Sequence, residues 1–218
     1  MDGRLAEREA LLTRLEANGY LTDPRLEEAM LAILRHRFVP PDMEPQAYED
    51  RPLQVGHGQT ISAPHMVALM TSLLQLEPDH RVLEIGTGRG YHAAVLGAMV
   101  PDGQVVSIEF VPELAHIAAG NLAESANVEV LVRDGALGAP EHAPFDALLI
   151  TCAIPEIPER LLAQLAEGGH VVAPIGTTAC DLVVGRKQSG AVELDPVGEC
   201  LFVNAQGELG GMGIQPAP

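Results

Sequence analysis

The sequence predicts an α/β fold, in which a doubly wound, mostly parallel sheet carries helices on both faces. Three observations support this prediction. The chain has 218 residues, of which 47% are hydrophobic, enough to bury one core of ordinary size. From Arg81 onward, short β-branched runs alternate with helical stretches. The first of these runs ends in a glycine-spaced turn, GTGRG at 86–90, where the backbone can pass close to a ligand.

The N-terminal segment predicts a helical cap on this sheet. Leucines recur at helical spacing after Arg4 until Asn18-Gly19 end a first helix, and Asp23-Pro24 begin a second with an N-cap and an early proline. The buried stripe of the second helix is expected to consist of Leu26, Met30, Ile33 and Leu34. Residues 38–62 hold prolines and glycines with little periodicity, which predicts a long ordered loop or a loop with short strands. Loops of that length are usually functional.

The rest of the chain predicts the core of the sheet and its edge. Pro64 begins a helix expected to run to Leu76. Strands are then predicted at 82–85, 105–109, 128–132, 146–151 and 170–175, and helices between them around 91–99, 112–125 and 157–166. Runs at 182–188 and 199–204 predict an antiparallel hairpin at the sheet edge. We therefore expect one domain, made of a helical cap and substrate loop (1–62), an α/β core (63–176) and edge strands with a tail (177–218).

Composition excludes several kinds of protein. A net charge of −17 and a pI near 4.7 argue against a nucleic-acid partner, because such binding needs clustered Lys and Arg. The charged N-terminus does not resemble a signal peptide, and no apolar run reaches the ~18 residues that a membrane span needs. Cys152, Cys180 and Cys200 are too few and too far apart in the sequence for a disulfide framework. We expect a cytoplasmic protein, and a monomer.

The glycine-spaced turn predicts a nucleotide-like cofactor. Gly86, Gly88 and Gly90 follow the strand in VLEIGTGRGY, but Tyr91 stands at the sixth position, where a dinucleotide site has its third glycine. Glu84, two residues before the turn, would repel a pyrophosphate yet could accept hydrogen bonds from an ammonium group. This combination favours S-adenosylmethionine, whose methionine end carries an ammonium group.

Two further strand ends support the same cofactor. Glu109 closes the second strand about 20 residues beyond the glycine turn, where an acidic side chain accepts from the hydroxyls of an adenosine ribose. Asp134-Gly135 follow the third strand, and Asp134 could accept from the exocyclic amine of adenine. Glycine turns and strand-end acids occur singly in many α/β proteins, so the prediction depends on finding all of these together.

The stretch GHGQTISAPH at 56–65 leaves several interpretations open. Ser62 could simply cap the helix that begins at Pro64. His57 and His65 could be a metal pair, but no third ligand stands near them at usable spacing, so we expect no metal site. From these residues alone, the stretch predicts a substrate loop of unknown specificity.

Several blocks of the sequence, in order, resemble protein-L-isoaspartate O-methyltransferases. The most specific block includes the GQTIS segment, because methyltransferases in general share the glycine turn but not this segment. The blocks are FVP at 38–40, AYEDRPLQVGHGQTISAPHMVALM at 47–70, VLEIGTGRGY at 82–91, APFDALLIT at 143–151 and IPERLLAQLAEGGHVVAPIG at 157–176. The resemblance covers about Arg37 to Gly176, and it implies a sheet of the Rossmann-like methyltransferase type.

The resemblance also implies an activity and its residues. Such enzymes use S-adenosylmethionine to methylate the free carboxylate of L-isoaspartyl residues in damaged proteins and peptides, and the ester then cyclises to a succinimide that hydrolyses partly to aspartate. Ser62 matches the active-site serine of the family. The other matching positions are those beside the cofactor or the substrate, namely Thr60, Ile61, His65, Glu84, Gly86, Gly88, Gly90, Glu109, Asp134 and Gly135.

The chemistry of these residue types suits such a transfer. A carboxylate with a pKa near ~4 is ionised at neutral pH and needs no general base, so the enzyme has mainly to place it. Neutral donors such as Ser62 and Thr60 hold a carboxylate without locking it in the ground state. A covalent role for Ser62 is disfavoured, because no base and orienting acid accompany it in a recognised motif.

Some positions depart from the family pattern and keep alternatives open. Arg89 stands where a small residue is usual, Cys152 where an alanine is expected, and FVN at 202–204 where the family commonly has FVPL. The tail GELGGMGIQPAP at 207–218 has no match. The alternatives are a related carboxyl methyltransferase with another carboxylate acceptor or a dedicated peptide, a dinucleotide-dependent oxidoreductase, and a non-catalytic binder of damaged chains. Acceptance of D-aspartyl sites is left open.

Overall fold

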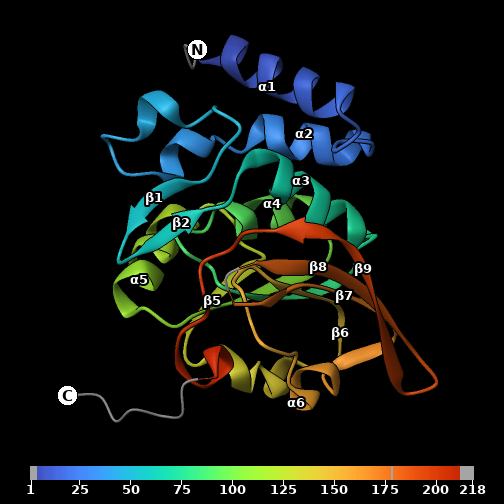
Figure 1. The fold of residues 1–218 in the computed structure, drawn as a ribbon. Helices are drawn as coiled ribbons and strands as arrows, with labels where there is room; N and C mark the ends of the chain where they lie inside the picture. Colours follow the sequence, from blue (N-terminus) through green and yellow to red (C-terminus); the bar gives the residue numbers. More distant parts are fainter. Residues whose placement is uncertain (1–3, 178, 212–218) are drawn as a thin grey trace.

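The computed structural model describes residues 4–177 and 179–211 and is built around one seven-stranded sheet. The strand order is β5-β4-β3-β6-β7-β8-β9, and the first five strands in this order are mutually parallel (Figure 1). The strands are β3 (Arg81–Ile85), β4 (Gln104–Glu109), β5 (Val128–Val132), β6 (Phe145–Ile150), β7 (Leu165–Gly176), β8 (Cys180–Gln188) and β9 (Ala191–Cys200). The predicted fold class, a mostly parallel sheet with an antiparallel edge, is confirmed.

The two faces of the sheet are covered unequally (Figure 1). One face is covered by α-helices, which are α2 (Pro24–Ala32), α3 (Pro64–Leu73), α4 (Tyr91–Met99) and α5 (Pro112–Asn121), and α1 (Leu5–Ala17) packs on α2 and α3. The other face is covered by short helices, which are α6 (Glu159–Leu162), η3 (Gly135–Leu137), η4 (Pro140–His142) and η5 (Gly207–Gly210). Because both faces are buried, the central strands are almost continuously apolar instead of alternating.

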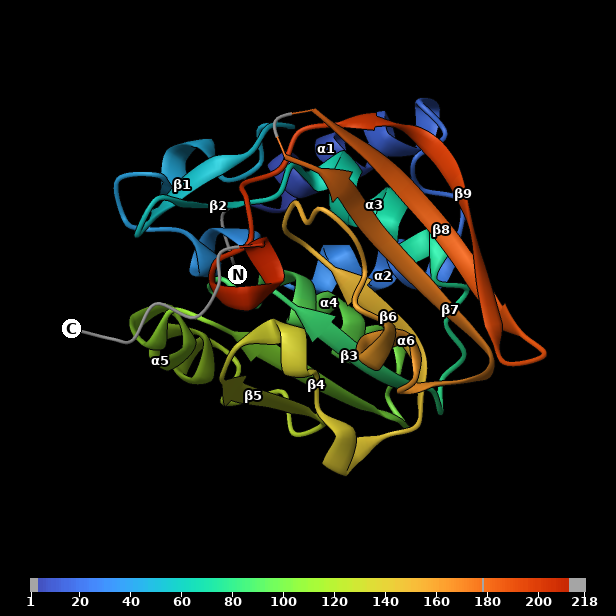
Figure 2. The same cartoon turned by 60° about the horizontal axis from the view of Figure 1, so that its bottom comes forward.

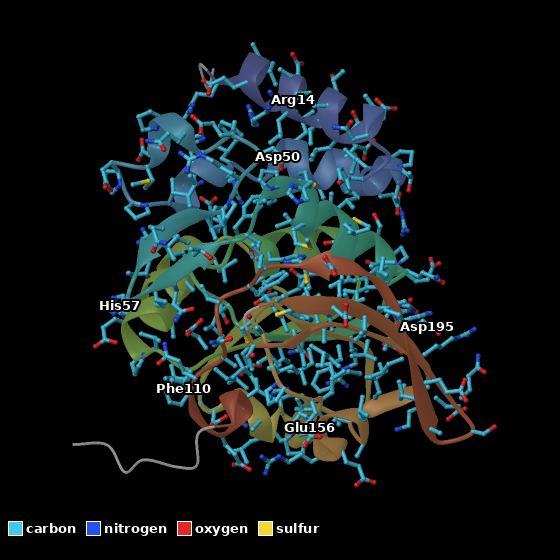
Figure 3. All side chains as sticks on the ribbon, in the orientation of Figure 1. Arg14, Asp50, His57, Phe110, Glu156 and Asp195 are labelled. Atoms are coloured by element: carbon cyan, nitrogen blue, oxygen red, sulfur yellow. The ribbon has the colours of Figure 1, made fainter. Side chains whose placement is uncertain are left out.

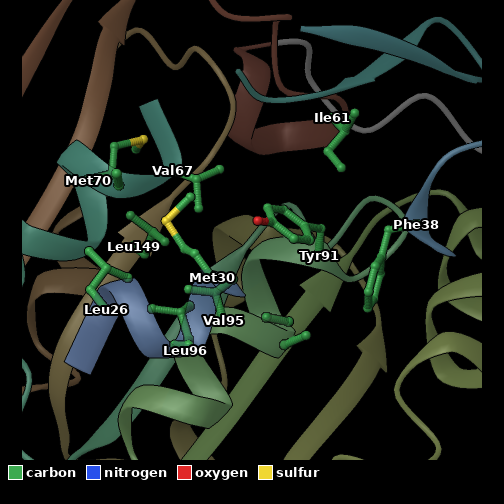
Figure 4. Close-up of a cluster of buried hydrophobic side chains, with 14 of the residues drawn as sticks. Leu26, Met30, Phe38, Ile61, Val67, Met70, Tyr91, Val95, Leu96 and Leu149 are labelled. Carbon is green, nitrogen blue, oxygen red and sulfur yellow. The ribbon is translucent and has the colours of Figure 1, made fainter. Parts of the chain in front are cut away.

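The larger core cluster lies between the sheet and the helical cap. Figure 4 shows Met30 of α2 among Val67 of α3, Val95 and Leu96 of α4. Leu149 of β6 closes this cluster from the sheet side and is fully buried. Burying each such side chain contributes about 1.5–3 kcal/mol, so the cap is part of the hydrophobic core and not an appended segment.

The predicted helix signals of the cap are largely confirmed. α1 ends just before Asn18, and Gly19 takes a left-handed φ of 76°. Asp23 caps α2 by accepting from the backbone N–H of Arg25 at 2.8 Å. The prediction that Ile33 and Leu34 belong to the buried stripe of the second helix is wrong, because α2 ends at Ala32. The chain is extended at Ile33 before the 3₁₀ helix η1 (Arg35–Phe38).

The loop predicted at 38–62 is an ordered loop with short strands. It contains a 3₁₀ turn, η2 (Glu44–Gln46), and an antiparallel hairpin formed by β1 (Leu53–Gly56) and β2 (Gln59–Ile61). Figure 2 shows this hairpin above the end of the sheet where β3 and β4 finish. The loop thus extends over one end of the parallel strands.

Several predicted boundaries are wrong. α3 ends at Leu73 and α5 at Asn121, each a few residues early, and α6 covers only Glu159–Leu162 of the predicted 157–166. β7 begins at Leu165, because this segment continues the sheet beside β6 and its sheet contacts override the helical pattern.

The second strand of the edge hairpin was predicted at 199–204 but lies at Ala191–Cys200. The turn is at Ser189-Gly190, with φ of 53° and 80°. β9 is an edge strand with one neighbour, so its charged residues stay in water, and Pro196 is tolerated beside a bulge in the β8–β9 register. A polar edge strand lacks the apolar alternation by which strands are found in a sequence.

Candidate active site

A cavity opens at the carboxyl ends of the parallel strands, where ligands bind in open α/β sheets. The chain crosses from β3 to β4 on one side and returns to β6 on the other, which makes this end of β3 the switch point. The cavity has a volume of about 830 Å³ including its open mouth. Its walls are the glycine turn, the ends of β4 and β6, the β1–β2 hairpin and the segment after β9.

The glycine turn is held against the neighbouring strands by its own backbone. The N–H of Gly86 donates to the carbonyl of Ile108 at 2.8 Å, and its carbonyl accepts from the Thr151 hydroxyl at 2.7 Å. Gly86 and Gly88 have φ of 104° and 58°, and a Cβ at Gly86 would collide with the Thr151 side chain. Both line the cavity, whereas Gly90, predicted with them, caps α4 and does not. Only glycine can bring the backbone this close to a ligand here.

Glu109 stands at the end of β4 and lines the cavity, as the sequence predicted. One carboxylate oxygen accepts from the N–H of Gly88 at 2.7 Å and the other from the N–H of Val111 at 2.9 Å. Burial raises the pKa of Glu109, and the backbone donors oppose that rise. The carboxylate therefore ties the glycine turn to β4 and presents an acceptor to the cavity.

Glu84 lies behind the glycine turn and is not among the cavity-lining residues. The Ser107 hydroxyl donates to its Oε2, and Thr87 of the turn is hydrogen-bonded to the same hydroxyl. In the described part of the chain, Oε1 of this fully buried carboxyl has no hydrogen-bond partner. Burial raises the pKa of Glu84 to about 8, and the Ser107 donor opposes that rise. The contact with an ammonium group stays a prediction, and the geometry favours support of the turn from beneath.

Asp134 and Gly135 follow β5 but occupy different places. Gly135 lines the cavity, and a Cβ there would collide with Ile85. Asp134 does not line the cavity, and its two carboxylate oxygens accept from the N–H of Ala136 at 2.9 Å and of Glu208 at 2.8 Å. Asp134 therefore fastens the C-terminal segment to the end of β5.

The β1–β2 hairpin brings Thr60, Ile61 and Ser62 to the cavity wall. The hydroxyl residues are half-buried. The N-cap of α3 is Ala63, and within residues 4–177 and 179–211 no side-chain hydrogen bond caps that helix. The structure thus excludes the helix-capping interpretation of Ser62, whose side chain borders the cavity.

The two histidines of this loop lie elsewhere. His65 does not line the cavity. Its backbone N–H and its Nδ1 both lie 2.9 Å from Oδ1 of Asp50. Its ring packs on Tyr20, with ring centroids 5.2 Å apart. Figure 3 shows His57 at the outer tip of the hairpin. Among the described residues, no cluster of three or more His, Cys, Asp or Glu side chains could hold a metal.

Two basic residues line the cavity without a predicted role, Arg89 and His92. Arg89 lines it, half-buried, and its Nε has no partner among the described residues. His92 lines it as well, and burial lowers the pKa of His92 to about 3, so the ring is neutral. The Thr71 hydroxyl donates to the carbonyl of Val67, so it accepts from Nε2–H of His92, and the ring's Nδ1 is then an acceptor with no partner in residues 4–177 and 179–211. The position of His92 as the second residue of α4 gave no sequence signal.

The C-terminal segment completes the cavity, although FVN at 202–204 departs from the family pattern and no sequence motif matched the tail from Gly207. Val203 accepts from the N–H of Ala153 at 2.8 Å, which lays the segment beside the residues after β6. The segment's lining residues are Val203, Asn204, Ala205, Gln206 and Leu209. Phe110, which follows Glu109, also lines the cavity and is 43% exposed (Figure 3). An exposed aromatic directly after a strand-end acid is a signal that could have been used.

The fold and the site together define the class of S-adenosylmethionine-dependent methyltransferases with a Rossmann-like sheet. A family model described as "Protein-L-isoaspartate(D-aspartate) O-methyltransferase (PCMT)" matches residues 6–210. The chain belongs to this family of methyltransferases.

Individual relatives agree with this assignment. The chain is 47% identical to the protein-L-isoaspartate O-methyltransferase of Methanopyrus kandleri over 209 residues, covering 93% of this chain and 92% of the relative. The one from Methanoculleus marisnigri is 47% identical over 211 residues, with coverage of 95% and 94%.

Two solved structures share the fold. A protein-L-isoaspartate O-methyltransferase superposes with a TM-score of 0.86 at 33% identity, covering 94% of this chain and 67% of that one. A Plasmodium falciparum structure described as a protein-L-isoaspartate O-methyltransferase, in complex with S-adenosyl-L-homocysteine, gives a TM-score of 0.82 at 26% identity, with coverage of 91% and 98%.

Proposed function

We propose that this protein transfers a methyl group from S-adenosylmethionine to the free carboxylate of L-isoaspartyl residues in damaged proteins and peptides. One observation carries the proposal. Thr60 and Ser62 line the same cavity as the glycine turn and Glu109, so the residues that we assign to the acceptor and those that we assign to the cofactor border one space. Family membership over residues 6–210 supports the same activity.

The residues present fit the cofactor. Gly86 and Gly88 form a cradle for the ligand. A Cβ at Gly86 would collide with Thr151, and a Cβ at Gly88 would strain the backbone because its φ is positive. Glu109 offers a carboxylate acceptor at the end of β4. Gly135 leaves room beside Ile85. When bound, S-adenosylmethionine supplies an electrophilic methyl group. We propose that Glu109 binds the ribose hydroxyls and that the glycine turn holds the methionine end.

The acceptor carboxylate needs placement more than activation. It is ionised at neutral pH, so no residue has to remove a proton. Ser62 and Thr60 are neutral donors on a short hairpin, and Ser62 is not used to cap α3. Transfer neutralises charge, so weakly held carboxylates lose less on the way to the transition state than ones paired with a cation would. We assign Ser62 the catalytic positioning of the carboxylate.

The predicted residues that do not line the cavity take supporting roles in this proposal. Glu84 holds the glycine turn through Ser107 and Thr87, and Asp134 holds the C-terminal segment through Glu208. His65 fixes the loop before α3 through its pair with Asp50.

Partners and location complete the proposal. The acceptors are isoaspartyl-containing proteins and peptides, and the charge of −17 argues against a nucleic-acid partner. Of the helices in the described ranges, none is both long and apolar enough to cross a membrane. We propose a cytoplasmic monomer that works as one domain, with the cap and substrate loop at 1–62, the core at 63–176 and the edge strands and tail at 177–218.

The test is transfer of labelled methyl from S-adenosylmethionine to two peptides that differ only in isoaspartate or aspartate at one position. We expect base-labile label on the isoaspartyl peptide alone. No label on either, with S-adenosylhomocysteine bound normally, would contradict the substrate assignment and leave the cofactor assignment standing.

A second candidate is a related carboxyl methyltransferase with another peptide acceptor. Asn204 lies exposed on the cavity rim where the family commonly has proline, so the rim offers an amide that a proline cannot. Label on a different carboxylate peptide, and none on the isoaspartyl one, would select this candidate.

A further inference from the structure

Two cysteines that are distant in the sequence lie directly opposite each other in the sheet. Cys180 opens β8, Cys200 closes β9, and the two are Cα partners in the antiparallel register. Such partners have Cα atoms about 4.5–5.5 Å apart and side chains on the same face, which lies inside the range of about 4.4–6.8 Å that disulfides bridge. Both are buried, at 2% and 8% exposure, in the same core cluster.

The surroundings make this pairing selective. Burial raises the pKa of Cys200, and the neighbouring Cys180 thiol adds to that rise. Cys152, the third cysteine, packs against the core cluster on the opposite face of the sheet. Cys180 is therefore placed to pair with Cys200 and not with Cys152.

The pair stands where the edge hairpin passes into the cavity wall. Cys200 is the last residue of β9, and the chain then runs to η5, lining the cavity from Val203 to Leu209 (Figures 1 and 2). The backbone amide of Phe202 donates toward the Cys180 sulfur. Leu201, which lies between Cys200 and Phe202 in the chain, is 80% exposed, so the packing of the strand into the core ends at Cys200. A bond between the two cysteines would fix to β8 the residue that directly precedes the segment 201–211.

We propose that Cys180 and Cys200 are a dithiol site that a peroxide oxidises to a disulfide, which holds the segment 201–211 in place and slows release of the adenosyl ligand. In the reaction an S–S bond forms, and the two thiols give up two protons and two electrons. One hydrogen peroxide accepts them, its O–O bond breaks, and two water molecules leave. The disulfide is independent of the proposed function, whereas its effect on ligand release rests on it.

Burial of Cys180 and Cys200 slows both the formation and the reduction of the disulfide. Burial raises the pKa of both thiols, and that of Cys200 to about 11, so little thiolate exists at neutral pH and oxidation is slow. Once formed, the bond is shielded from small reductants by the same burial. Disulfides in a reducing compartment are usually transient or redox-sensing, which suits a site that responds to sustained oxidation.

The experiment treats the whole protein with hydrogen peroxide, denatures it, alkylates the remaining thiols and measures mass. We expect loss of the mass of two hydrogen atoms, one alkylated cysteine of the three, and a cross-linked peptide pair carrying Cys180 and Cys200. Cys180→Ser and Cys200→Ser are matched controls that should show no cross-link. A wild-type protein that yields only oxygen adducts, or a cross-link through Cys152, would overturn the site.

Dissociation of tritiated S-adenosylhomocysteine then tests the consequence. Oxidised wild type should release it several-fold more slowly than the same sample after full reduction with dithiothreitol under denaturing conditions and refolding. The comparison uses one protein, so it does not depend on the variants folding. Equal release rates would overturn the effect on the ligand while the mass result decides the disulfide. No binding to the reduced protein would count against the proposed function and the effect together.

Discussion

The two walls of the cavity are built differently. On the sheet side, Gly86 and Glu109 are tied by backbone hydrogen bonds to Ile108, Gly88 and Val111. On the covering side, Thr60, Ser62 and Gln206 are half-buried side chains on a short hairpin and an irregular segment. The sheet side is preorganised for one constant ligand, whereas the covering side can adapt to acceptors of varied sequence.

The largest effect should come from breaking the sheet side at Gly86. Gly86→Ala puts a Cβ against Thr151 on a backbone with φ of 104°. We expect about 1–3 kcal/mol less stability in chemical denaturation and no measurable binding of S-adenosylhomocysteine in calorimetry.

Gly120→Ala is the matched control for this change. Gly120 lies in α5, and a Cβ there meets nothing within 4 Å. It should leave ligand affinity unchanged and raise stability slightly, because alanine favours helix. Equal ligand binding by both variants would show that the cradle is not needed.

On the covering side, Ser62→Ala should lower kcat about tenfold, the effect of losing roughly 1.4 kcal/mol of transition-state stabilisation. Affinity for S-adenosylmethionine should change little, because we propose that the hydroxyl binds the acceptor and not the cofactor. Steady-state kinetics and calorimetry measure the two effects. If the variant loses cofactor affinity and keeps its kcat, Ser62 contacts the cofactor and not the acceptor.

Glu109→Ala should weaken cofactor binding by about 1–3 kcal/mol, since it strands hydrogen-bond donors of the ligand and of Gly88. Glu109→Gln keeps one acceptor and should lose less. Calorimetry with S-adenosylhomocysteine gives both values. If the two variants bind like wild type, the carboxylate does not contact the ligand.

Glu84 should make stability depend on pH. Its pKa is raised from 4.5 to about 8 in the folded state by burial. Its contribution is therefore fully present below pH 4.5 and is lost as the pH rises through about 8, because the unfolded chain ionises first. Glu84→Gln should remove this decline between pH 5 and 8 in urea denaturation. Parallel curves for both proteins would show that Glu84 titrates normally.

The smallest effect is expected at Arg89, which could belong to either wall. Its Nε has no partner in the described ranges, so Arg89→Ser should change stability by no more than about 0.5 kcal/mol. Cofactor affinity should stay within about the same margin. A large loss of affinity for S-adenosylmethionine, with KM for the peptide unchanged, would place Arg89 on the sheet side.

The sequence by itself determined the elements with short-range causes. The apolar runs of β3 to β6, the Asp23-Pro24 helix start and the positive-φ glycines at 86 and 88 all follow from local periodicity and turn chemistry. The position of Glu109 at the cavity followed from its place at a strand end, whereas Ser62 was placed in the active site only by the resemblance to the family.

Tertiary structure decided what depends on neighbours distant in the chain. Only packing beside β8 makes the polar stretch Ala191–Cys200 a strand, and only that register sets Cys180 opposite Cys200. The fold brings the backbone N–H of Glu208 to Asp134, because a strand-end carboxylate accepts from whichever donor lies near, and the contact of Asp134 with adenine stays a prediction. These outcomes depend on long-range hydrogen bonds and burial, which local residue patterns do not encode.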